Sequence, residues 1–341
     1  MRSDTGHQAA VLGAGSWGTA LAIHLASAGH AVTLWGRDGA LVEEMRHRRA
    51  NPTYLPDITF PPQLKPVSAL DEALAGARHV IIAIPSHGLR AAVNAAAPAI
   101  PRGAVLVSAT KGIEEGTLQR MSEVVRDETG GRHAVVALSG PSFAAEVARH
   151  LPTALVAAST DPLAVKAVQD EFRGPAFRLY ATDDVVGVEI GAALKNIIAI
   201  AAGVTESMNL GHNAMSALIT RGLAEISRLA CAMGGRRESL SGLSGLGDLV
   251  LTCTGALSRN RHVGIELGRG RSLDEILAGM RMVAEGVRTT SAALALGERY
   301  GVELPIAAQM AEVLAGRSTP AGAVGNLMLR PQRVEHDAAN Q

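Results

Sequence analysis

The stretch Gln8-Ala-Ala-Val-Leu-Gly-Ala-Gly-Ser-Trp-Gly18 decides the fold of this chain. Its first five residues predict a short strand that leads directly into a glycine-rich turn. An apolar helical pattern follows and ends at Gly29, and Ala31–Trp35 predicts a second strand. Strand, glycine-rich turn, helix and second strand in this order form a βαβ unit of the dinucleotide-binding type. The glycine motif alone is a weak signal, but this context makes the prediction strong.

Each of the three glycines has its own role in such a turn. Gly13 makes the turn, Gly15 lets the backbone approach a pyrophosphate, and Gly18 lets the helix pack closely against the strand. The start of the helix would then present free N–H groups to the diphosphate. A tight turn that binds nothing is the alternative, and the complete βαβ pattern disfavours it.

The residues after the second strand bear on the choice between NAD(H) and NADP(H). Gly36, Arg37 and Asp38 stand about 20 residues beyond the glycines, where an acidic residue would bind a ribose 2′-hydroxyl and an arginine suits a 2′-phosphate. The basic run Arg46–Arg49 adds positive charge, although such a run is usually a solvated helix face. The sequence favours NADP(H) and leaves NAD(H) open, because Asp38 could still reach the ribose.

Strand-like runs alternate with helical ones through the first half of the chain, which predicts a doubly wound parallel sheet. These runs are His79–Ile84, Ala104–Ser108, Ala134–Leu138 and Thr153–Ala158. In such a sheet, ligands lie beyond the carboxyl ends of the strands. The segments expected there are Pro85–His87, Ala109–Gly112 and Ser139–Ala144. Lys111 is therefore expected at the cleft, with an exposed loop lysine as the alternative.

From about Gly187 onward the strands largely stop and long helical patterns dominate. The expected helices include Met215–Met233, Leu273–Met282, Thr289–Tyr300 and Ala307–Leu314. We therefore expect an α/β fold with two domains. A dinucleotide-binding Rossmann-type domain would span residues 1–187, and an all-helical substrate-binding domain would span residues 188–341.

One lysine stands in the middle of the apolar stretch Gly187–Gly203. Lys195 is the only charged residue between Ile190 and Thr205, and apolar residues occur on every face, which predicts a buried helix. The stretch is too short, and too strongly interrupted by its lysine, for a bilayer span of roughly 20 residues. Burial would lower the pKa of Lys195 towards a useful acid–base range. The alternative is a lysine that reaches out to water at the helix edge.

Lysine usage supports the chemical interpretation of Lys195. Only four of the 32 basic residues are lysines, so arginine serves almost wherever a plain positive charge is needed. A guanidinium effectively cannot lose its proton, whereas an ammonium can. A lysine kept at an apolar position therefore indicates amine chemistry.

Two more segments of the second domain carry candidate binding groups. Asp248 ends the glycine-rich Gly245-Leu-Gly-Asp248 and is either a site carboxylate or a helix N-cap. Ser258, followed by Arg259 and Asn260, predicts a helix start that receives an oxyanion, with a plain surface helix start as the alternative. Cys253 is expected to pack rather than to act as a nucleophile.

The overall composition excludes several classes of function. Lysine plus arginine equals aspartate plus glutamate at 32 each, so no global field favours nucleic acid or an anionic membrane. Two cysteines, Cys231 and Cys253, form no disulfide framework, and the histidines show no metal-ligand spacing. Residues 1–8 lack an apolar signal core. We expect a cytoplasmic protein without a metal.

The motifs taken together resemble a known family. Residues 13–20, Ala109–Gly112, Ser139–Ala144, Leu194–Asn196, residues 245–249, Ser258–Arg261 and residues 285–286 look like bacterial NAD(P)-dependent glycerol-3-phosphate dehydrogenase, in order over roughly residues 8–320. The resemblance implies reversible reduction of dihydroxyacetone phosphate to sn-glycerol 3-phosphate, which supplies phospholipid synthesis. Two rivals are a 2-hydroxyacid or ketopantoate-type reductase on the same plan and a non-enzymatic nucleotide sensor.

The resemblance also implies a set of site residues and partners. Lys195 would be the proton donor and acceptor, with Asn196 beside it. The implied substrate-binding residues are Lys111, Gly140, Ser142, Lys195, Asp248, Ser258, Arg259 and Asn260. The implied cofactor-binding residues are Gly13, Gly15, Ser16, Trp17, Gly18, Arg37, Tyr54, Lys111, Ala144, Arg259, Val283 and Glu285. The expected ligands are NADP(H) or NAD(H) and a phosphorylated triose. The sequence leaves the oligomeric state open, with a homodimer as one alternative.

Overall fold

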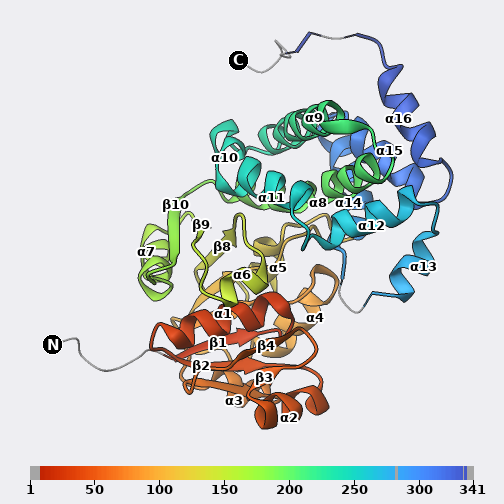
Figure 1. The fold of residues 1–341 in the computed structure, drawn as a ribbon. Coiled ribbons are helices and arrows are strands. Elements are labelled where there is room, and N and C mark those ends of the chain that lie inside the picture. The colour runs from red at the N-terminus through yellow and green to blue at the C-terminus, as the bar shows by residue number, and fades with distance from the viewer. Residues whose placement is uncertain (1–7, 281–282, 333, 336–341) are drawn as a thin grey trace.

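The computed structural model describes residues 8–280, 283–332 and 334–335. Residues 1–7, on which the prediction about a signal segment rests, and Met282, the expected end of one helix, lie outside this range. Figure 1 shows two lobes: the N-terminal one contains a sheet with helices on it, and the C-terminal one contains helices. The predicted α/β plan with a helical second domain is therefore present.

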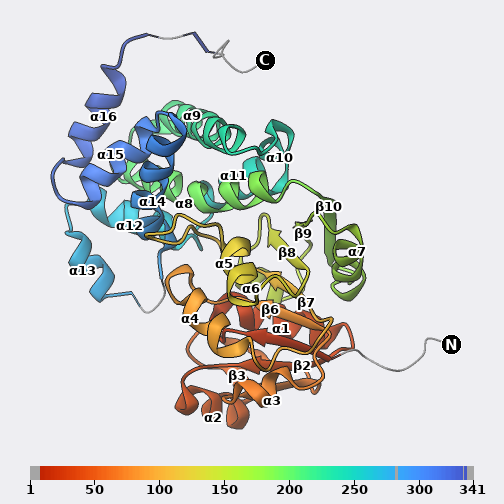
Figure 2. The same ribbon diagram turned by 180° about the vertical axis from the view of Figure 1, so that it is seen from behind.

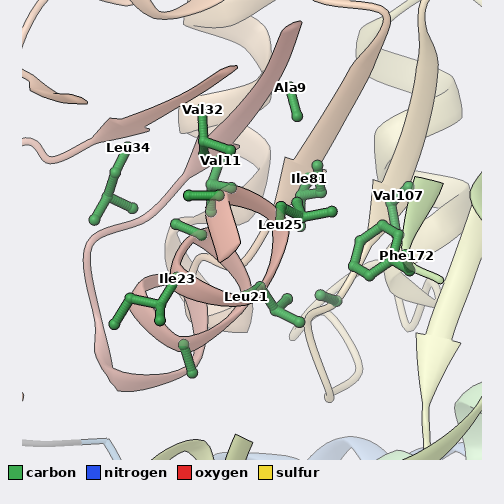
Figure 3. Close-up of a cluster of buried hydrophobic side chains, with 14 of the residues drawn as sticks. Ala9, Val11, Leu21, Ile23, Leu25, Val32, Leu34, Ile81, Val107 and Phe172 are labelled. Atoms are coloured by element: carbon green, nitrogen blue, oxygen red, sulfur yellow. The ribbon is translucent and has the colours of Figure 1, made fainter. Parts of the chain in front are cut away.

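The first βαβ unit forms as the sequence predicts. Strand β1 (Gln8–Leu12) leads into helix α1 (Ser16–Ser27), and β2 (Ala31–Trp35) returns parallel to β1 with Leu12 opposite Trp35. Figure 3 shows Leu21 and Leu25 of α1 in one buried cluster with sheet residues that include Val11. Close packing of this apolar helix face on the strands fixes the start of α1 above the sheet.

The main sheet has eight strands in the order β10-β9-β8-β7-β6-β1-β2-β5. The strands not yet given are β5 (Leu64–Val67), β6 (His79–Ile82), β7 (Val105–Ser108), β8 (Val135–Ser139), β9 (Thr153–Ala158) and β10 (Phe177–Thr182). Ala9 and Val11 belong to one apolar cluster, and Ala10 and Leu12 to another on the opposite face. Successive side chains of β1 therefore point into two different apolar clusters, so both faces of the sheet are covered by apolar packing.

Six helices besides α1 complete this domain, and Figure 2 shows the sheet from the side opposite to that in Figure 1. They are α2 (Gly39–Arg48), α3 (Leu70–Leu74), α4 (Ser86–Ala96), α5 (Met121–Glu128), α6 (Ala144–Ala148) and α7 (Pro162–Glu171). The region after α2 carries several prolines. It contains a small antiparallel pair, β3 (Ala50–Asn51) and β4 (Leu55–Thr59), which the sequence reasoning missed, as it missed β5 and β10.

The parallel pattern is confirmed for the strands that run from β5 to β8 across the sheet, but β9 departs from it. β9 pairs antiparallel with β8, and β10 runs parallel to β9. The intervening helix α6 has five residues, so it advances the chain by only ~8 Å, about half the length of a five-residue strand. The chain therefore begins β9 near the carboxyl edge of the sheet and runs back.

The C-terminal domain is helical throughout the residues that the structure describes beyond Thr182. Its helices are α8 (Val185–Ser207), α9 (Gly211–Ala232), α10 (Arg237–Ser241), α11 (Asp248–Thr254), α12 (Arg259–Gly268), α13 (Leu273–Ala278), α14 (Glu285–Tyr300), α15 (Pro305–Leu314) and α16 (Pro320–Met328), with a π-helical turn at Leu243–Gly247 before α11. The helices expected at residues 215–233, 289–300 and 307–314 lie in α9, α14 and α15, with α9 ending one residue early at Ala232. The helix expected at residues 273–282 is predicted too long, because α13 ends at Ala278 with Gly279 as its C-cap.

Helix α8 is the core of this domain, and α9, α11, α12 and α14 pack around it. Its length is underestimated by the sequence reasoning, because with 23 residues it is long and apolar enough to cross a bilayer. In its most apolar window, however, 89% of the residues are buried inside the protein. The burial, rather than the length, identifies α8 as a core helix.

Helices α8 and α12 touch backbone to backbone. A Cβ atom added to Gly264 of α12 would lie 1.9 Å from the carbonyl oxygen of Ile200, and one added to Gly203 of α8 would lie 2.0 Å from that of Arg261. Both distances are far inside van der Waals contact. Only glycine fits at these two positions, and the crossing places the start of α12 close to the middle of α8.

Candidate active site

Two lysines from different domains meet on one carboxylate. Lys195 Nζ on α8 lies 2.8 Å from Asp248 Oδ1, and Lys111 Nζ, in the loop after β7, lies 2.6 Å from Asp248 Oδ2. Lys111 also donates a hydrogen bond to the carbonyl oxygen of Gly140 at 3.1 Å. Two ammonium groups facing one carboxylate leave the cluster with one net positive charge. Such a cluster can stabilise an oxygen atom on which negative charge develops.

Lys195 is buried, and burial changes its pKa. Its side chain is only 6% exposed, so the alternative in which it reaches bulk water is wrong. Burial lowers the pKa of Lys195 from its ordinary 10.5 to about 8, and the negative charge of Asp248 opposes this shift. A lysine with this pKa is available in both protonation states near neutral pH.

Thr252 completes the cluster, and the sequence reasoning missed it. Lys195 Nζ donates a hydrogen bond to Thr252 Oγ1 at 2.6 Å, while the Thr252 hydroxyl donates to the backbone carbonyl of Asp248 at 2.6 Å. A hydroxyl has one proton, so this geometry directs a lone pair of Thr252 at the ammonium. Lys195 is thus held from two sides on α11.

The carboxylate of Asp248 does not cap its helix. Asp248 is the first residue of α11, but its two oxygen atoms bind the two lysines. It is 1% exposed, and a buried carboxylate needs such partners. The N-cap alternative is therefore contradicted. Nearby Cys253 is also buried, and burial raises its pKa to about 12, which disfavours a nucleophilic thiolate.

The glycine-rich turn fits a dinucleotide. Gly13 has a φ of +117°, and a Cβ on Gly18 would lie 1.9 Å from the carbonyl oxygen of Gly13, so both positions require glycine. A Cβ on Gly15, in contrast, would meet nothing within 4 Å. No side chain among the described residues caps the start of α1. Open space at Gly15 next to the start of a helix is the geometry that a diphosphate needs.

Two side chains around this turn add to the fit. Asn51 donates to the carbonyl of Ala14 and to the Thr19 hydroxyl, both at 2.9 Å, and so fixes the turn from the side of β3. The indole Nε1 of Trp17 is buried with no hydrogen-bond partner among the described residues. Ser16, also in the predicted set, begins α1 and is half-buried.

Arg37 and Asp38, which follow β2, differ in their contacts. Arg37 is exposed, whereas Asp38 is the N-cap of α2 and accepts from the N–H groups of Ala40 and Leu41 at 3.0 and 3.3 Å. The arginines of the basic run at residues 46–49 contact nearby residues. Arg46 and Arg48 form ion pairs with Glu43 and Glu44, and Arg49 donates a hydrogen bond to a backbone carbonyl. Arg37, in contrast, is exposed just after the end of β2.

The predicted oxyanion receptor is the start of α12. Ser258 is its N-cap and accepts from the N–H of Arg261 at 3.2 Å. Asn260 Nδ2 donates to Asn196 Oδ1 at 3.0 Å, which ties this helix start to the residue next to Lys195. A cavity of about 310 Å³ lies against Ser258 and Arg259. The structure thus brings the predicted anion receptor to the neighbourhood of the lysine cluster.

Glu285 and Ser86 form a second contact between the domains. Glu285, the first residue of α14, accepts from the Ser86 backbone N–H at 3.0 Å and from the Ser86 hydroxyl at 2.5 Å. The next N–H, that of Gly286, donates to Asn260 Oδ1 at 2.9 Å. Glu285 and Tyr54 also lie close enough to act electrostatically on the Arg259 guanidinium. The contact from Ser86 has no local sequence signal, because the two residues are 199 positions apart.

The remaining predicted residues are Gly140, Ser142, Ala144 and Val283. Gly140 has a φ of +137° and its carbonyl accepts from the Ser142 hydroxyl at 3.1 Å. Ala144 begins α6, and Val283 is half-buried directly after two residues that the structure does not describe. Among the residues that are described, no group of three or more histidine, cysteine or acidic side chains is placed to hold a metal ion.

Comparisons with known proteins agree over both domains. The family described as NAD-dependent glycerol-3-phosphate dehydrogenase matches with its N-terminal model at residues 8–165 and with its C-terminal model at residues 184–325. The glycerol-3-phosphate dehydrogenase (NAD(P)+) of Thioalkalivibrio sulfidiphilus is 53% identical over 269 residues, which are 79% of this chain and 81% of that protein. The corresponding protein of Koribacter versatilis is 52% identical over 272 residues, with coverages of 79% and 81%.

Solved structures give the same result. The crystal structure of glycerol-3-phosphate dehydrogenase from Coxiella burnetii superposes with a TM-score of 0.92 at 40% identity and covers 95% of this chain and 99% of that chain. A ketopantoate reductase from Ralstonia eutropha has a TM-score of 0.59 at 17% identity, with coverages of 91% and 99%, a likeness of fold alone. On its sequence and its structure, this chain belongs to the glycerol-3-phosphate dehydrogenase family.

Proposed function

We propose that this enzyme reduces dihydroxyacetone phosphate reversibly to sn-glycerol 3-phosphate with NAD(P)H, and that Lys195 exchanges the proton. The observation that carries the assignment of Lys195 is its burial against Asp248 and Lys111, where the two domains meet. Membership of the family supports the substrate and the cofactor. The product of this reaction would supply phospholipid synthesis.

The proposed mechanism assigns a separate task to each group of the cluster. NAD(P)H, when bound, supplies the hydride to the C2 carbonyl of the substrate. Protonated Lys195 stabilises the negative charge that develops on the carbonyl oxygen and delivers a proton to it, an effect typically worth ~10²–10⁴-fold in rate. Asp248 orients Lys195 and Lys111 and balances one of their charges. The buried position of Lys195 excludes bulk water and strengthens these interactions.

The start of α12 would hold the substrate phosphate. Its first N–H groups and the guanidinium of Arg259 can bind a dianion, and Ser258 fixes the helix start. Asn260 connects this anchor to Asn196 and so to the reacting end of the site. Holding the remote phosphate fixes C2 relative to the proton donor, which removes much of the entropic barrier.

The dinucleotide would lie along the glycine-rich turn, with its diphosphate at the start of α1 and its ribose near Arg37. The exposed guanidinium of Arg37 and the role of Asp38 as a helix cap support a preference for NADP(H).

We further propose that the Rossmann-type domain binds the nucleotide and the helical domain binds the triose. Cytoplasmic location is supported by two free cysteines. A homodimer is supported by exposed apolar side chains such as Met328 and Leu329, and light scattering would test it.

The substitution Lys195→Met tests the role of Lys195. It removes the ammonium but keeps a buried apolar stem, so we expect kcat to fall by at least ~10²-fold while cofactor binding survives. Oxidation of NADPH and NADH is followed at 340 nm. Lys166→Met is the matched control, because Lys166 is an exposed lysine on α7 that pairs with Asp170. Near-normal turnover of Lys195→Met would remove Lys195 from the mechanism.

A substrate comparison tests the reaction itself. The proposal requires dihydroxyacetone phosphate to be reduced far more efficiently than unphosphorylated dihydroxyacetone, because only the former reaches the start of α12. Similar values of kcat/KM for the two ketones would exclude the proposed substrate and favour a small 2-keto acid reductase.

A further inference from the structure

The loop that carries Lys111 crosses from the sheet domain into the helical domain. It begins after β7, and its residue Ile113 is 2% exposed and belongs to the apolar core of the helical domain. Leu118, further along the loop, packs against the same core. On the sheet side, Arg90 of α4 binds Glu114 through two nitrogen atoms at 2.8 and 2.7 Å. The loop is therefore held by both domains.

The far end of this loop binds the helix that carries Lys195. Glu189 of α8 accepts from the Ser122 N–H at 2.8 Å, from the Ser122 hydroxyl at 2.6 Å and from Arg120 Nη1 at 2.7 Å. Its side chain is only 6% exposed. Burial raises the pKa of Glu189, and the charge of Arg120 and the hydrogen bonds from Ser122 oppose this shift. A buried carboxylate with three donors has little freedom to move.

The packing beside this contact leaves an open space. A cavity of about 410 Å³ lies against Arg120, Glu123 and Val186, and residues of both domains line it. The polar contact at Glu189 therefore adds to the apolar contacts that α8 makes with the sheet domain, such as the cluster of Val188 with Ala137 and Ala158, in fixing how α8 sits relative to α5.

The spacing along α8 makes this contact relevant to the lysine cluster. Glu189 precedes Lys195 by six residues, which is ~9 Å along a helix axis. A helix is stiff over that length, so a slip or rotation at Glu189 moves Lys195 by a similar amount. The loop that carries Lys111 leads along the chain to Arg120 and Ser122, which bind Glu189. Both ammonium groups must reach Asp248 within hydrogen-bond distance, which leaves well under 1 Å of tolerance.

We infer that Glu189, held by Arg120 and Ser122, is a positioning residue that aligns the Lys195 helix with the Lys111 loop across the domain boundary. Glu189 does not touch the lysine cluster, and it acts through the stiffness of α8 and of the loop. The inference rests on the proposed role of Lys195 as proton donor.

The test is the substitution Glu189→Gln in the full-length enzyme. An amide keeps the shape of the side chain, but whichever way it turns, its NH2 group faces a donor on Arg120 or Ser122. We expect kcat for reduction of dihydroxyacetone phosphate to fall by ~10- to ~100-fold, the effect of a displacement near 1 Å. KM for this substrate should stay within about threefold, because the start of α12 is untouched.

The pH profile gives a readout that loss of stability alone would not move. The alkaline limb of kcat in wild type should follow Lys195, and in Glu189→Gln it should move to lower pH as the ion pair with Asp248 loosens. The double variant Glu189→Gln with Arg120→Gln places two amides face to face and should recover most of the loss in kcat. If Glu189→Gln does not fold, Ser122→Ala removes one donor and should show a smaller loss with the same shift.

Glu225→Gln is the matched control. Glu225 is also a buried carboxylate of the helical domain, 2% exposed, but it accepts from the N–H groups of Ile306 and Ala307 within that domain. Its neutralisation should leave kcat and the alkaline limb unchanged. If both Glu189→Gln and Ser122→Ala retain wild-type kcat and pH profile, the inference is wrong. That result is distinct from failure of the proposed function, which active Lys195→Met would reveal.

Discussion

Replacing the shared carboxylate in Asp248→Asn gives the sharpest test of the site. The substitution removes the negative charge 2.8 Å from Lys195 Nζ and leaves two ammonium groups facing a neutral amide. Loss of an opposite charge at this distance typically lowers a lysine pKa by about 1–3 units. Because the pKa of Lys195 starts at about 8, we expect it to fall to between about 5 and about 7 in the variant.

The size of the effect on the rate follows from the protonated fraction. Reduction of the ketone requires protonated Lys195, so activity is lost as the pH rises through its pKa. At about pH 7.5 the protonated fraction falls from ~76% to between ~24% and ~0.3%, which lowers kcat by roughly 3-fold to roughly 200-fold. The alkaline limb of the profile should move to lower pH by the same 1–3 units, about as far as the pKa itself.

The assay is the pH dependence of kcat between about pH 5 and pH 10 with dihydroxyacetone phosphate and saturating cofactor. Asp170→Asn is the control, because Asp170 pairs with Lys166 on the exposed face of α7 and should leave the limb in place. An Asp248→Asn enzyme whose alkaline limb stays near pH 8, or moves upward, would refute the electrostatic argument for Lys195.

Four further predictions address the cofactor, the phosphate anchor and the stability of the helical domain. Arg37→Asp should lower the NADPH-to-NADH ratio of kcat/KM by ~10-fold or more, and an unchanged ratio would remove Arg37 from cofactor selection. Arg259→Gln should lower kcat/KM for dihydroxyacetone phosphate by ~10- to ~100-fold and leave the low value for dihydroxyacetone nearly unchanged. Gly264→Ala should lower the free energy of unfolding by at least ~2 kcal/mol in urea titrations, whereas Gly39→Ala, with open space around its Cβ, should be close to neutral. Burial raises the pKa of Glu225 from 4.5 to about 7, so the folded state binds its proton more tightly and the stability declines as the pH rises between these values. Urea titrations at about pH 5 and pH 7.5 should show that Glu225→Gln removes up to ~2.4 kcal/mol of that decline.

Local patterns in the sequence predict those parts of the structure that depend on neighbours in the chain. The βαβ unit at residues 8–35 follows from glycine spacing and apolar periodicity, and both are set within one short segment. The burial of Lys195 follows from apolar residues on every face of its helix. Ser258 as a helix N-cap follows from the residue type and the three residues after it.

Features that depend on partners far along the chain leave no such pattern. The reversal of β9 is decided by the short reach of α6, and strand direction does not alter the alternation of side chains. In the sequence, Thr252 is not distinguished from its apolar neighbours in α11. Its partner Lys195 lies 57 positions away, so no local pattern indicates their hydrogen bond. The contact of Ser86 with Glu285 joins two helix starts that only the packing of the domains brings together.

The glycine contact between α8 and α12 has a consequence for substrate choice. Because main chain meets main chain at Gly203 and Gly264, no change of side-chain rotamer between the two helices can alter the distance from the backbone at Lys195 to the backbone at Ser258. This fixed distance sets how far the reacting carbon can lie from the phosphate. In a phosphorylated ketone with one more or one fewer carbon between these groups, the carbonyl carbon would be misplaced relative to Lys195 even when the phosphate is bound.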